Sequence, residues 1–147
     1  MITEHPAAII IGKLMNIGGM LHRQGNKLLL PFNLNYPQFS IFFEIGKAGK
    51  VKQKDMVNRL LLEKAHVSKV VKKLQKMNLI TITENTDDKR SHWLSLTVKG
   101  EETLKQSTTA IRKWNDDWIS EINQPDIQSI MDKITTLQNL FMEKTSN

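Results

Sequence analysis

The segment from Lys64 to Asn78 constrains the fold more than any other part of the chain, because its apolar side chains recur at helical spacing. The apolar positions, at i, i+3, i+4, i+7 and i+10, are Val67, Val70, Val71, Leu74 and Met77. This periodicity predicts an amphipathic helix with one buried stripe. Asn78 is placed to end the helix in a left-handed conformation. The positions left outside are polar or basic: Lys64, His66, Ser68, Lys69, Lys72, Lys73 and Lys76.

The residues on either side of this helix predict a second short helix and a β-hairpin. Residues Lys52 to Leu60, after Gly46 and Gly49, carry Met56, Val57 and Leu60 at positions that would face inward. On the other side, Ile80 and Ile82 alternate with threonines over 80 to 84, and Leu94 and Leu96 share one face over 93 to 96, which is typical of half-buried strands. The polar residues 85 to 91 between them predict the hairpin loop.

Longer helices are predicted nearer the two ends of the chain. Apolar spacing predicts one over 7 to 30, one over 98 to 122 after a Thr97 cap, and one over 126 to 143 after Gln124 and Pro125. Between the first of these and the short helices, Asn35 and Gln38 have the spacing of a capping box. The core face of the helix they begin is predicted to hold Phe39, Phe42, Phe43 and Ile45.

Together these elements predict a mainly α fold with a small β-hairpin wing. Two short helices, the second with a basic outward face, followed by a two-stranded hairpin, form the layout of a winged helix-turn-helix. We expect one chain, 1–147, with this DNA-binding lobe over 35–97. The helices of 5–30 and 98–144 carry more apolar surface than a small lobe can cover, so we expect them to dimerise.

The positive charge is concentrated in the middle of the chain. The net charge is +6, yet Lys47 to Lys76 holds ten basic and two acidic residues, or +8. The remaining residues hold eleven basic and thirteen acidic ones, or −2. A basic centre between mildly acidic ends indicates a localised surface for a polyanion. A solvated lysine face is the alternative on charge alone.

Several other classes of protein are disfavoured by what the sequence lacks. There is no cysteine, no histidine pair at i, i+4, no glycine-flanked serine elbow and no complete phosphate loop, so we expect no enzyme, no metal and no cofactor. The apolar run Ala7 to Ile11 is too short to span a bilayer, and Glu4 and His5 precede it where a secretory signal would be basic. We therefore expect a cytoplasmic protein. Binding to an anionic lipid surface is the competing hypothesis for the lysine-rich helix.

Two motifs in the wing and beyond it resemble a known family. Asp88 and Arg90 form an Asp-x-Arg motif, and Leu96, Thr97 and Gly100 form a Leu-Thr-x-x-Gly helix entry. With this spacing, residues 51 to 100 closely resemble the MarR family of bacterial transcriptional regulators, which also has this chain's length and helix order. The family usually has Gly before the first wing strand and Arg shortly after it, where this chain has Asn78 and Ile82.

The resemblance implies a homodimer that binds a pseudo-palindromic operator in double-stranded DNA as a ligand-responsive repressor. Arg90 would enter the minor groove, and Asp88 would hold the wing. A small aromatic or amphipathic effector would bind beside Met15, His22, Phe42 and Trp114, although core or dimer packing is the alternative for the tryptophan. A constitutive DNA-binding protein without an effector also stays open. The predicted DNA-binding residues are Lys64, His66, Ser68, Lys69, Lys72, Lys73, Asp88, Lys89 and Arg90.

Overall fold

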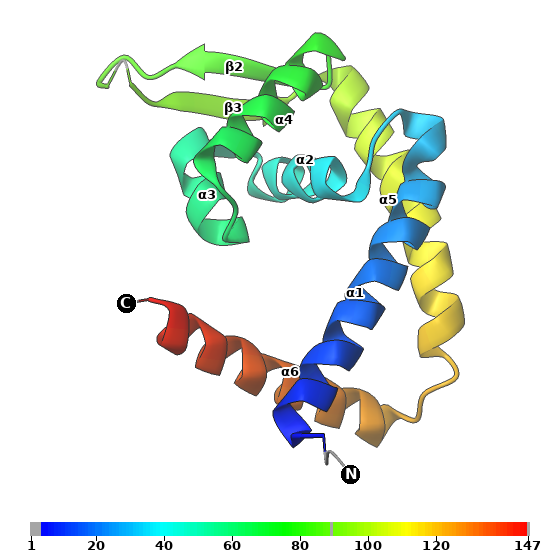
Figure 1. Cartoon of the computed structure of the whole chain (residues 1–147). Helices are drawn as coiled ribbons and strands as arrows, with labels where there is room; N and C mark the ends of the chain where they lie inside the picture. Colours follow the sequence, from blue (N-terminus) through cyan, green and yellow to red (C-terminus); the bar gives the residue numbers. More distant parts are fainter. Residues whose placement is uncertain (1–3, 89, 147) are drawn as a thin grey trace. The chain divides into compact units, whose positions relative to one another are not determined.

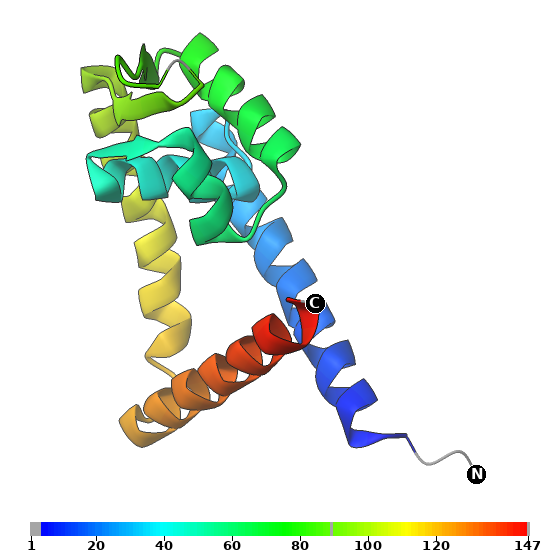
Figure 2. The same ribbon diagram turned by 90° about the vertical axis from the view of Figure 1, so that its left-hand side faces the viewer.

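The computed structural model describes residues 4–88 and 90–146, and it confirms the predicted fold class of helices with a small antiparallel sheet (Figure 1). The β2–β3 hairpin extends from the lobe formed by the short helices, and Figure 2 shows α2, α3 and α4 grouped together from the side. The elements in chain order are α1 (Pro6–Leu29), a 3-10 turn η1 (Leu30–Phe32), α2 (Tyr36–Ala48), β1 (Lys50–Lys52), α3 (Gln53–Leu60), α4 (Lys64–Lys76), β2 (Ile80–Glu84), β3 (His92–Leu96), α5 (Val98–Ile119) and α6 (Gln124–Thr145).

The helix ends follow from residues that the sequence singles out. Asn35 accepts a hydrogen bond from the Gln38 amide at 2.9 Å, and the Gln38 side chain accepts one from the Asn35 amide at 3.0 Å, which confirms the capping box. Asn78 has a φ of 58°, the predicted left-handed conformation after α4. The Thr97 hydroxyl accepts from the Gly100 amide at 2.9 Å, so Thr97 caps α5 as predicted.

The sheet has one strand more than the sequence predicts. Its order is β1-β3-β2, with β3 antiparallel to both neighbours. In the hairpin Ile82 pairs with Leu94, and on the other side of β3 Val51 pairs with the same Leu94. The central strand is therefore held from both edges, which fixes the root of the wing beside the helices.

The buried core lies within the lobe and its immediate neighbours. Of the four residues predicted for the α2 core face, Phe39, Phe42 and Ile45 are buried, but Phe43 is 38% exposed and that expectation is wrong. Ile41 is fully buried instead of Phe43, so the buried face of α2 consists of Phe39, Ile41, Phe42 and Ile45. The core consists of Leu29, Leu34, Phe39, Ile41, Phe42, Ile45, Val51, Met56, Val67, Val70, Val71, Leu74, Leu79, Ile80 and Leu94.

A close connection joins the end of α4 to the start of α5. The Thr97 hydroxyl donates to the Asn78 carbonyl at 2.6 Å, and the Thr97 amide donates to the Leu79 carbonyl at 3.1 Å. A Cβ at Gly100 would collide with that same Leu79 carbonyl, so glycine is required for this approach. The first turn of α5 is thereby fixed against the residues that follow α4.

The chain divides into two compact units, with the division between Ile111 and Arg112, inside α5. In the second unit, α5 ends at Ile119, earlier than predicted, and α6 begins at Gln124 with Pro125 in its first turn. No side chain of α6 is buried. Within residues 4–88 and 90–146, no helix is both long and apolar enough to cross a membrane.

Candidate nucleic-acid interface

Helix α4 places its polar residues in two adjacent stripes. Positions 64, 68, 72 and 75 follow one another at steps of four and three residues, so they share one face. Positions 69, 73 and 76 form a second stripe beside it, again at steps of four and three. The buried valines and Leu74 anchor the opposite side against α2 and α3. The helix is therefore held by its core stripe and leaves a broad polar face available.

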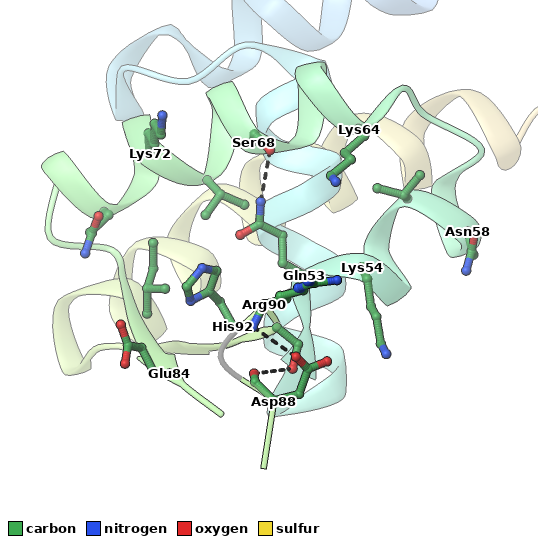
Figure 3. Close-up of a pocket in the computed structure, with 15 residues that line it drawn as sticks. Gln53, Lys54, Asn58, Lys64, Ser68, Lys72, Glu84, Asp88, Arg90 and His92 are labelled. Carbon is green, nitrogen blue, oxygen red and sulfur yellow. Dashed lines mark hydrogen bonds between the residues drawn. The ribbon is translucent and has the colours of Figure 1, made fainter. Parts of the chain in front are cut away.

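A groove of about 890 Å³ lies where α3, α4 and the wing meet (Figure 3). The first stripe of α4 forms one wall, and the β2–β3 hairpin contributes Arg90 and Asp88. Ile82, at the position where the family usually has Arg, also lines it. The residues around the groove are Gln53, Lys54, Val57, Asn58, Lys64, Ser68, Val71, Lys72, Gln75, Ile82, Glu84, Asp88, Arg90, Ser91 and His92.

The charge of this groove is positive and largely unpaired. It is lined by four cationic side chains and by the two carboxylates of Glu84 and Asp88. The one ion pair found within residues 4–88 and 90–146 joins Lys47 to Glu44 at 3.8 Å, outside the groove. Cations without carboxylate partners attract a polyanion, because their charge is not already neutralised within the protein. The four cations are Lys54, Lys64, Lys72 and Arg90.

Hydrogen bonds within the wing loop orient the backbone around Arg90. The Asp88 carboxylate accepts from the Arg90 amide at 3.0 Å, and the Asp88 carbonyl accepts from the Ser91 amide at 3.0 Å. Ser91 is buried, and its hydroxyl also accepts from the Asn85 side chain at 3.1 Å. These bonds leave the Arg90 side chain exposed at the tip. Asp88 thus holds the loop through backbone groups.

The other predicted DNA-binding residues lie in different surroundings. Lys69 is exposed on the second stripe of α4, and His66 is half-buried outside the groove. Lys73 donates from Nζ to the Gln38 side chain of α2 at 3.0 Å, so it is directed toward α2. Lys89 lies outside the described residues. Of the predicted set, the groove brings together Lys64, Ser68, Lys72, Asp88 and Arg90.

The groove also contains residues that no sequence pattern singles out. Gln53, Lys54 and Asn58 come from α3, and Gln75 comes from the last turn of α4. A helical projection of α4 places Gln75 on the stripe of Ser68, so its position could have been read from spacing. Nothing local distinguishes Gln53, because its place depends on how α3 packs against α4.

His92 begins β3 directly after the wing loop and pairs with Glu84 in the last pair of the hairpin ladder. Its Nδ1 is buried and has no hydrogen-bond partner among the described residues. Within the same residues there is no cluster of three or more His, Asp or Glu side chains that would hold a metal ion. The groove thus combines cations, amides and hydroxyls with two carboxylates, the His92 ring and three apolar side chains.

The four residues predicted for an effector pocket occupy separate environments. Met15 and His22 are exposed on α1, whereas Phe42 is fully buried in the core of the lobe. Trp114 is half-buried on α5, with its ring centroid 6.3 Å from that of Trp118. None of the four lines the groove of α3, α4 and the wing. An effector pocket at these residues stays a prediction.

Comparisons with known proteins agree with this geometry. The MarR family model matches residues 34–92, which cover the lobe and most of the wing. The transcriptional regulator SarZ of Staphylococcus saprophyticus is 29% identical over 116 residues, covering 79% of this chain and 75% of SarZ. An uncharacterized HTH-type transcriptional regulator of Staphylococcus aureus is 25% identical over 122 residues, covering 82% of this chain and 84% of that protein.

Solved structures share the fold. A mutant MarR from E. coli, complexed with operator DNA, superposes with a TM-score of 0.79 at 16% identity, covering 89% of this chain and 95% of that one. The transcriptional regulator RdhR-CbdbA1625, in its 2,4-dichlorophenol-bound form, gives a TM-score of 0.87 at 20% identity, covering 97% and 85% of the two chains. The relatives that match in sequence are regulators of transcription and not enzymes. The basic helix and the wing that form one groove lie within or next to residues 34–92, which match the MarR family model, and the chain is similar over that region to HTH-type transcriptional regulators.

Proposed function

We propose that the chain acts as a homodimer that represses transcription by occupying a pseudo-palindromic operator. The lobe of residues 35–97 would bind DNA, and the helices of 5–30 and 98–144 would dimerise. The observation that carries the DNA-binding surface is the groove between α3, α4 and the wing, whose four cations have no carboxylate partner within 4.0 Å among the described residues. In a two-fold dimer the two α4 helices would enter major grooves about 34 Å apart.

The individual contacts divide by chemistry. Ser68 and Lys72 lie at the middle of the groove face of α4, where a helix in the major groove comes closest to base edges. Lys64, Lys69 and Lys73, near the edges of that face, would contact phosphates, and His66 at the first turn would contact a phosphate or base. Asp88 would orient the loop from which Lys89 reaches a phosphate and Arg90 enters the minor groove.

Exposed apolar side chains support the homodimer. On α1 the large apolar residues that are at least 42% exposed are Ile9, Ile10, Ile11, Met15, Ile17, Met20 and Leu21. On α6 they are Ile130, Met131, Ile134, Leu140, Phe141 and Met142, each at least 43% exposed. Monomeric proteins rarely leave so much contiguous apolar surface in water. A second copy offers identical apolar helices, and two-fold pairing covers both sets at once.

Salt dependence tests the polyanion surface directly. If each protomer neutralises about four phosphates, the dimer neutralises about eight, and log K should fall against log salt with a slope of about −7. Fluorescence anisotropy with an operator duplex selected from random DNA would measure this slope. Anionic vesicles serve as the second titrant, because binding to vesicles without duplex binding would favour a lipid surface. A slope near zero would contradict the proposal.

Response to an effector is a second part of the proposal. RdhR-CbdbA1625 contains 2,4-dichlorophenol in one solved form, and here a phenolic or other apolar ligand would bind beside Trp114. Such a ligand would lower operator affinity through a coupling of about 1 to 3 kcal/mol. Titration of tryptophan fluorescence with 2,4-dichlorophenol, using free and operator-bound protein, measures the coupling. Equal affinity in both states would identify a DNA-binding protein without this effector.

A further inference from the structure

A hydrogen bond between the two short helices links one side chain of α3 to one side chain of α4. The Gln53 amide nitrogen Nε2 donates to the Ser68 hydroxyl oxygen at 3.1 Å (Figure 3). The two residues are fifteen positions apart in sequence, both are half-buried, and both line the groove. Gln53 is the first residue of α3, so its side chain extends from a fixed helix end. The two side chains therefore behave as one positioned unit.

This unit keeps hydrogen-bonding groups free on both side chains, among them the Ser68 hydroxyl hydrogen as a donor and the Gln53 Oε1 as an acceptor. Ser40 and Ser107 donate to the carbonyl four residues earlier, at 3.0 Å and 2.7 Å, as serines in helices often do. No such bond occupies the Ser68 hydroxyl hydrogen within residues 4–88 and 90–146, and none there occupies the Gln53 carbonyl oxygen. The Gln53 Oε1 is not among the enclosed polar atoms that lack a partner, so it is accessible, and Ser68 is a half-buried residue that lines the groove.

The pattern does not depend on the direction of the bond. With Nε2 donating, the unit offers the Ser68 O–H as donor and the Gln53 Oε1 as acceptor. With the amide reversed, it offers a Gln53 N–H as donor and a Ser68 lone pair as acceptor. A serine alone serves as either donor or acceptor and distinguishes bases poorly. Linked to Gln53, the hydroxyl is held beside a Gln53 group of the opposite kind, so a donor and an acceptor lie next to each other.

Only one base matches a donor beside an acceptor on its own major-groove edge. Adenine presents the N7 acceptor next to the N6 amino donor, whereas guanine presents two acceptors, cytosine one amino donor, and thymine one acceptor beside its methyl group. We propose that Gln53 and Ser68 together read an adenine in the major groove of the operator. This inference rests on the proposed function, and it names what the centre of the interface recognises. Gln53 is thereby a specificity-determining residue contributed by α3.

The decisive variant is Gln53→Glu, which keeps the shape of the side chain and removes its donor. The Ser68 hydroxyl then donates to the carboxylate, and the unit offers acceptors alone. Acceptors match the cytosine N4 amino group and oppose adenine N7. Selection of duplexes from a random pool should therefore change one base per half-site from adenine to cytosine. Wild type should bind the adenine duplex about 5- to 150-fold more tightly than the cytosine duplex, and Gln53→Glu should reverse this order.

A second variant and a matched control separate specificity from charge and folding. Ser68→Ala should lower the discrimination between adenine and guanine at the same position at least fivefold, about the lower limit for such a contact. Gln75→Glu introduces the same charge into the same groove from α4. It should weaken binding to all duplexes and leave adenine preferred at the Gln53 position. Circular dichroism and sedimentation confirm that each variant keeps its fold and assembly.

The outcomes distinguish this inference from the proposed function. If wild type selects no sequence, the proposed function fails and the reading of adenine fails with it. If wild type selects an operator but Gln53→Glu and Ser68→Ala select the same bases with unchanged discrimination, the inference is overturned and the proposed function stands. A change to cytosine at that position with Gln75→Glu as well would also overturn it, because charge alone would then explain the effect.

Discussion

The winged lobe and the terminal helices use apolar residues in opposite ways. In the lobe, α4 has four buried side chains and α2 has four, and the core residues among them contact one another. Helix α6, with 22 residues, has none buried, and α1, with 24, buries only Gly25 and the Leu29 side chain, both in its C-terminal half. The lobe therefore buries most of its apolar side chains within the chain, whereas α1 and α6 leave most of theirs exposed.

This difference separates the residues that stabilise the fold from those that we propose stabilise the dimer. A buried Val or Leu side chain contributes about 1.5 to 3 kcal/mol when it leaves water. The apolar side chains of α4 are already buried in the single chain, so substitutions there should alter the free energy of unfolding. The apolar side chains of α6 are not buried in the single chain, so substitutions there should alter the free energy of the proposed association. Four predictions test or refine this division.

The largest effect is expected from charge on α6. Ile134→Asp combined with Phe141→Asp removes two apolar side chains per protomer, four per dimer, each about half exposed in the single chain. Burying the exposed half of each contributes about 0.7 to 1.5 kcal/mol, or about 3 to 6 kcal/mol of association in total. Sedimentation velocity at micromolar concentration should show a monomer, and operator binding should be lost. Gln138→Asp, an exposed polar position on the same helix, is the matched control and should stay dimeric. A double variant that still dimerises would end the proposed role of α6.

The next effect compares one alanine substitution in each region. Leu74→Ala removes a fully buried side chain of α4 and should lower the free energy of unfolding by about 2 to 5 kcal/mol. Ile134→Ala, at a side chain 51% exposed, should change that of the separated protomer by no more than about 0.5 kcal/mol. Urea titration at concentrations where the protein is monomeric measures both. Equal losses would show that α6 packs within its own chain.

A smaller effect is expected at the tip of the wing. Arg90→Ala should lower operator affinity by about 1 to 3 kcal/mol, because a planar guanidinium loses water easily and fits a narrow A·T-rich minor groove. Lysine should restore little of the loss, and Asp88→Ala should act less strongly, by loosening the loop. Replacing the flanking A·T pairs with G·C should remove most of the difference between Arg90→Ala and wild type.

Anisotropy at about 0.15 M salt, where long-range attraction is screened, measures these affinities. Arg112→Ala removes an exposed arginine outside the groove and should bind as wild type does. If Arg90→Ala also binds as tightly as wild type, the wing does not read DNA in this protein.

The smallest effect concerns the backbone after α3. Leu61 has a φ of 53° and is 63% exposed, so a branched side chain adopts the left-handed conformation with little packing to compensate. Leu61→Gly should relieve that strain and raise the free energy of unfolding by about 0.5 kcal/mol, after the greater entropy of an unfolded glycine is deducted. The urea midpoint would show it. A decrease would mean that the Leu61 side chain stabilises the turn.

Most helices could be predicted because their determinants are local. The Asn35 capping box, the left-handed Asn78 and the Thr97 cap each depend on residues within three or four positions. The strand β1 could not be predicted, because its three residues become a strand only by pairing with β3, more than forty positions away. The exposure of Phe43 was missed because a small rotation of α2 decides which aromatic residues face inward.

The candidate site was predictable in composition and less so in contacts. Helical spacing correctly placed Lys64, Ser68 and Lys72 on one face, since that face is fixed by the buried stripe. It could not show that Lys73 bonds to Gln38, or that Gln53 reaches Ser68, because both bonds connect different helices. Long-range packing therefore determines which polar residues face the groove.

The connection between α4 and α5 has a mechanical consequence. Two hydrogen bonds from Thr97 and the close approach of Gly100 to the Leu79 carbonyl leave no compliant linker between these helices. A tilt of the first turns of α5 should therefore move the C-terminal end of α4 in the same direction. A larger side chain at position 100 would disrupt the contact with the Leu79 carbonyl without changing any residue of the groove. It would uncouple the movement of α5 from the orientation of α4, the helix that we propose enters the DNA.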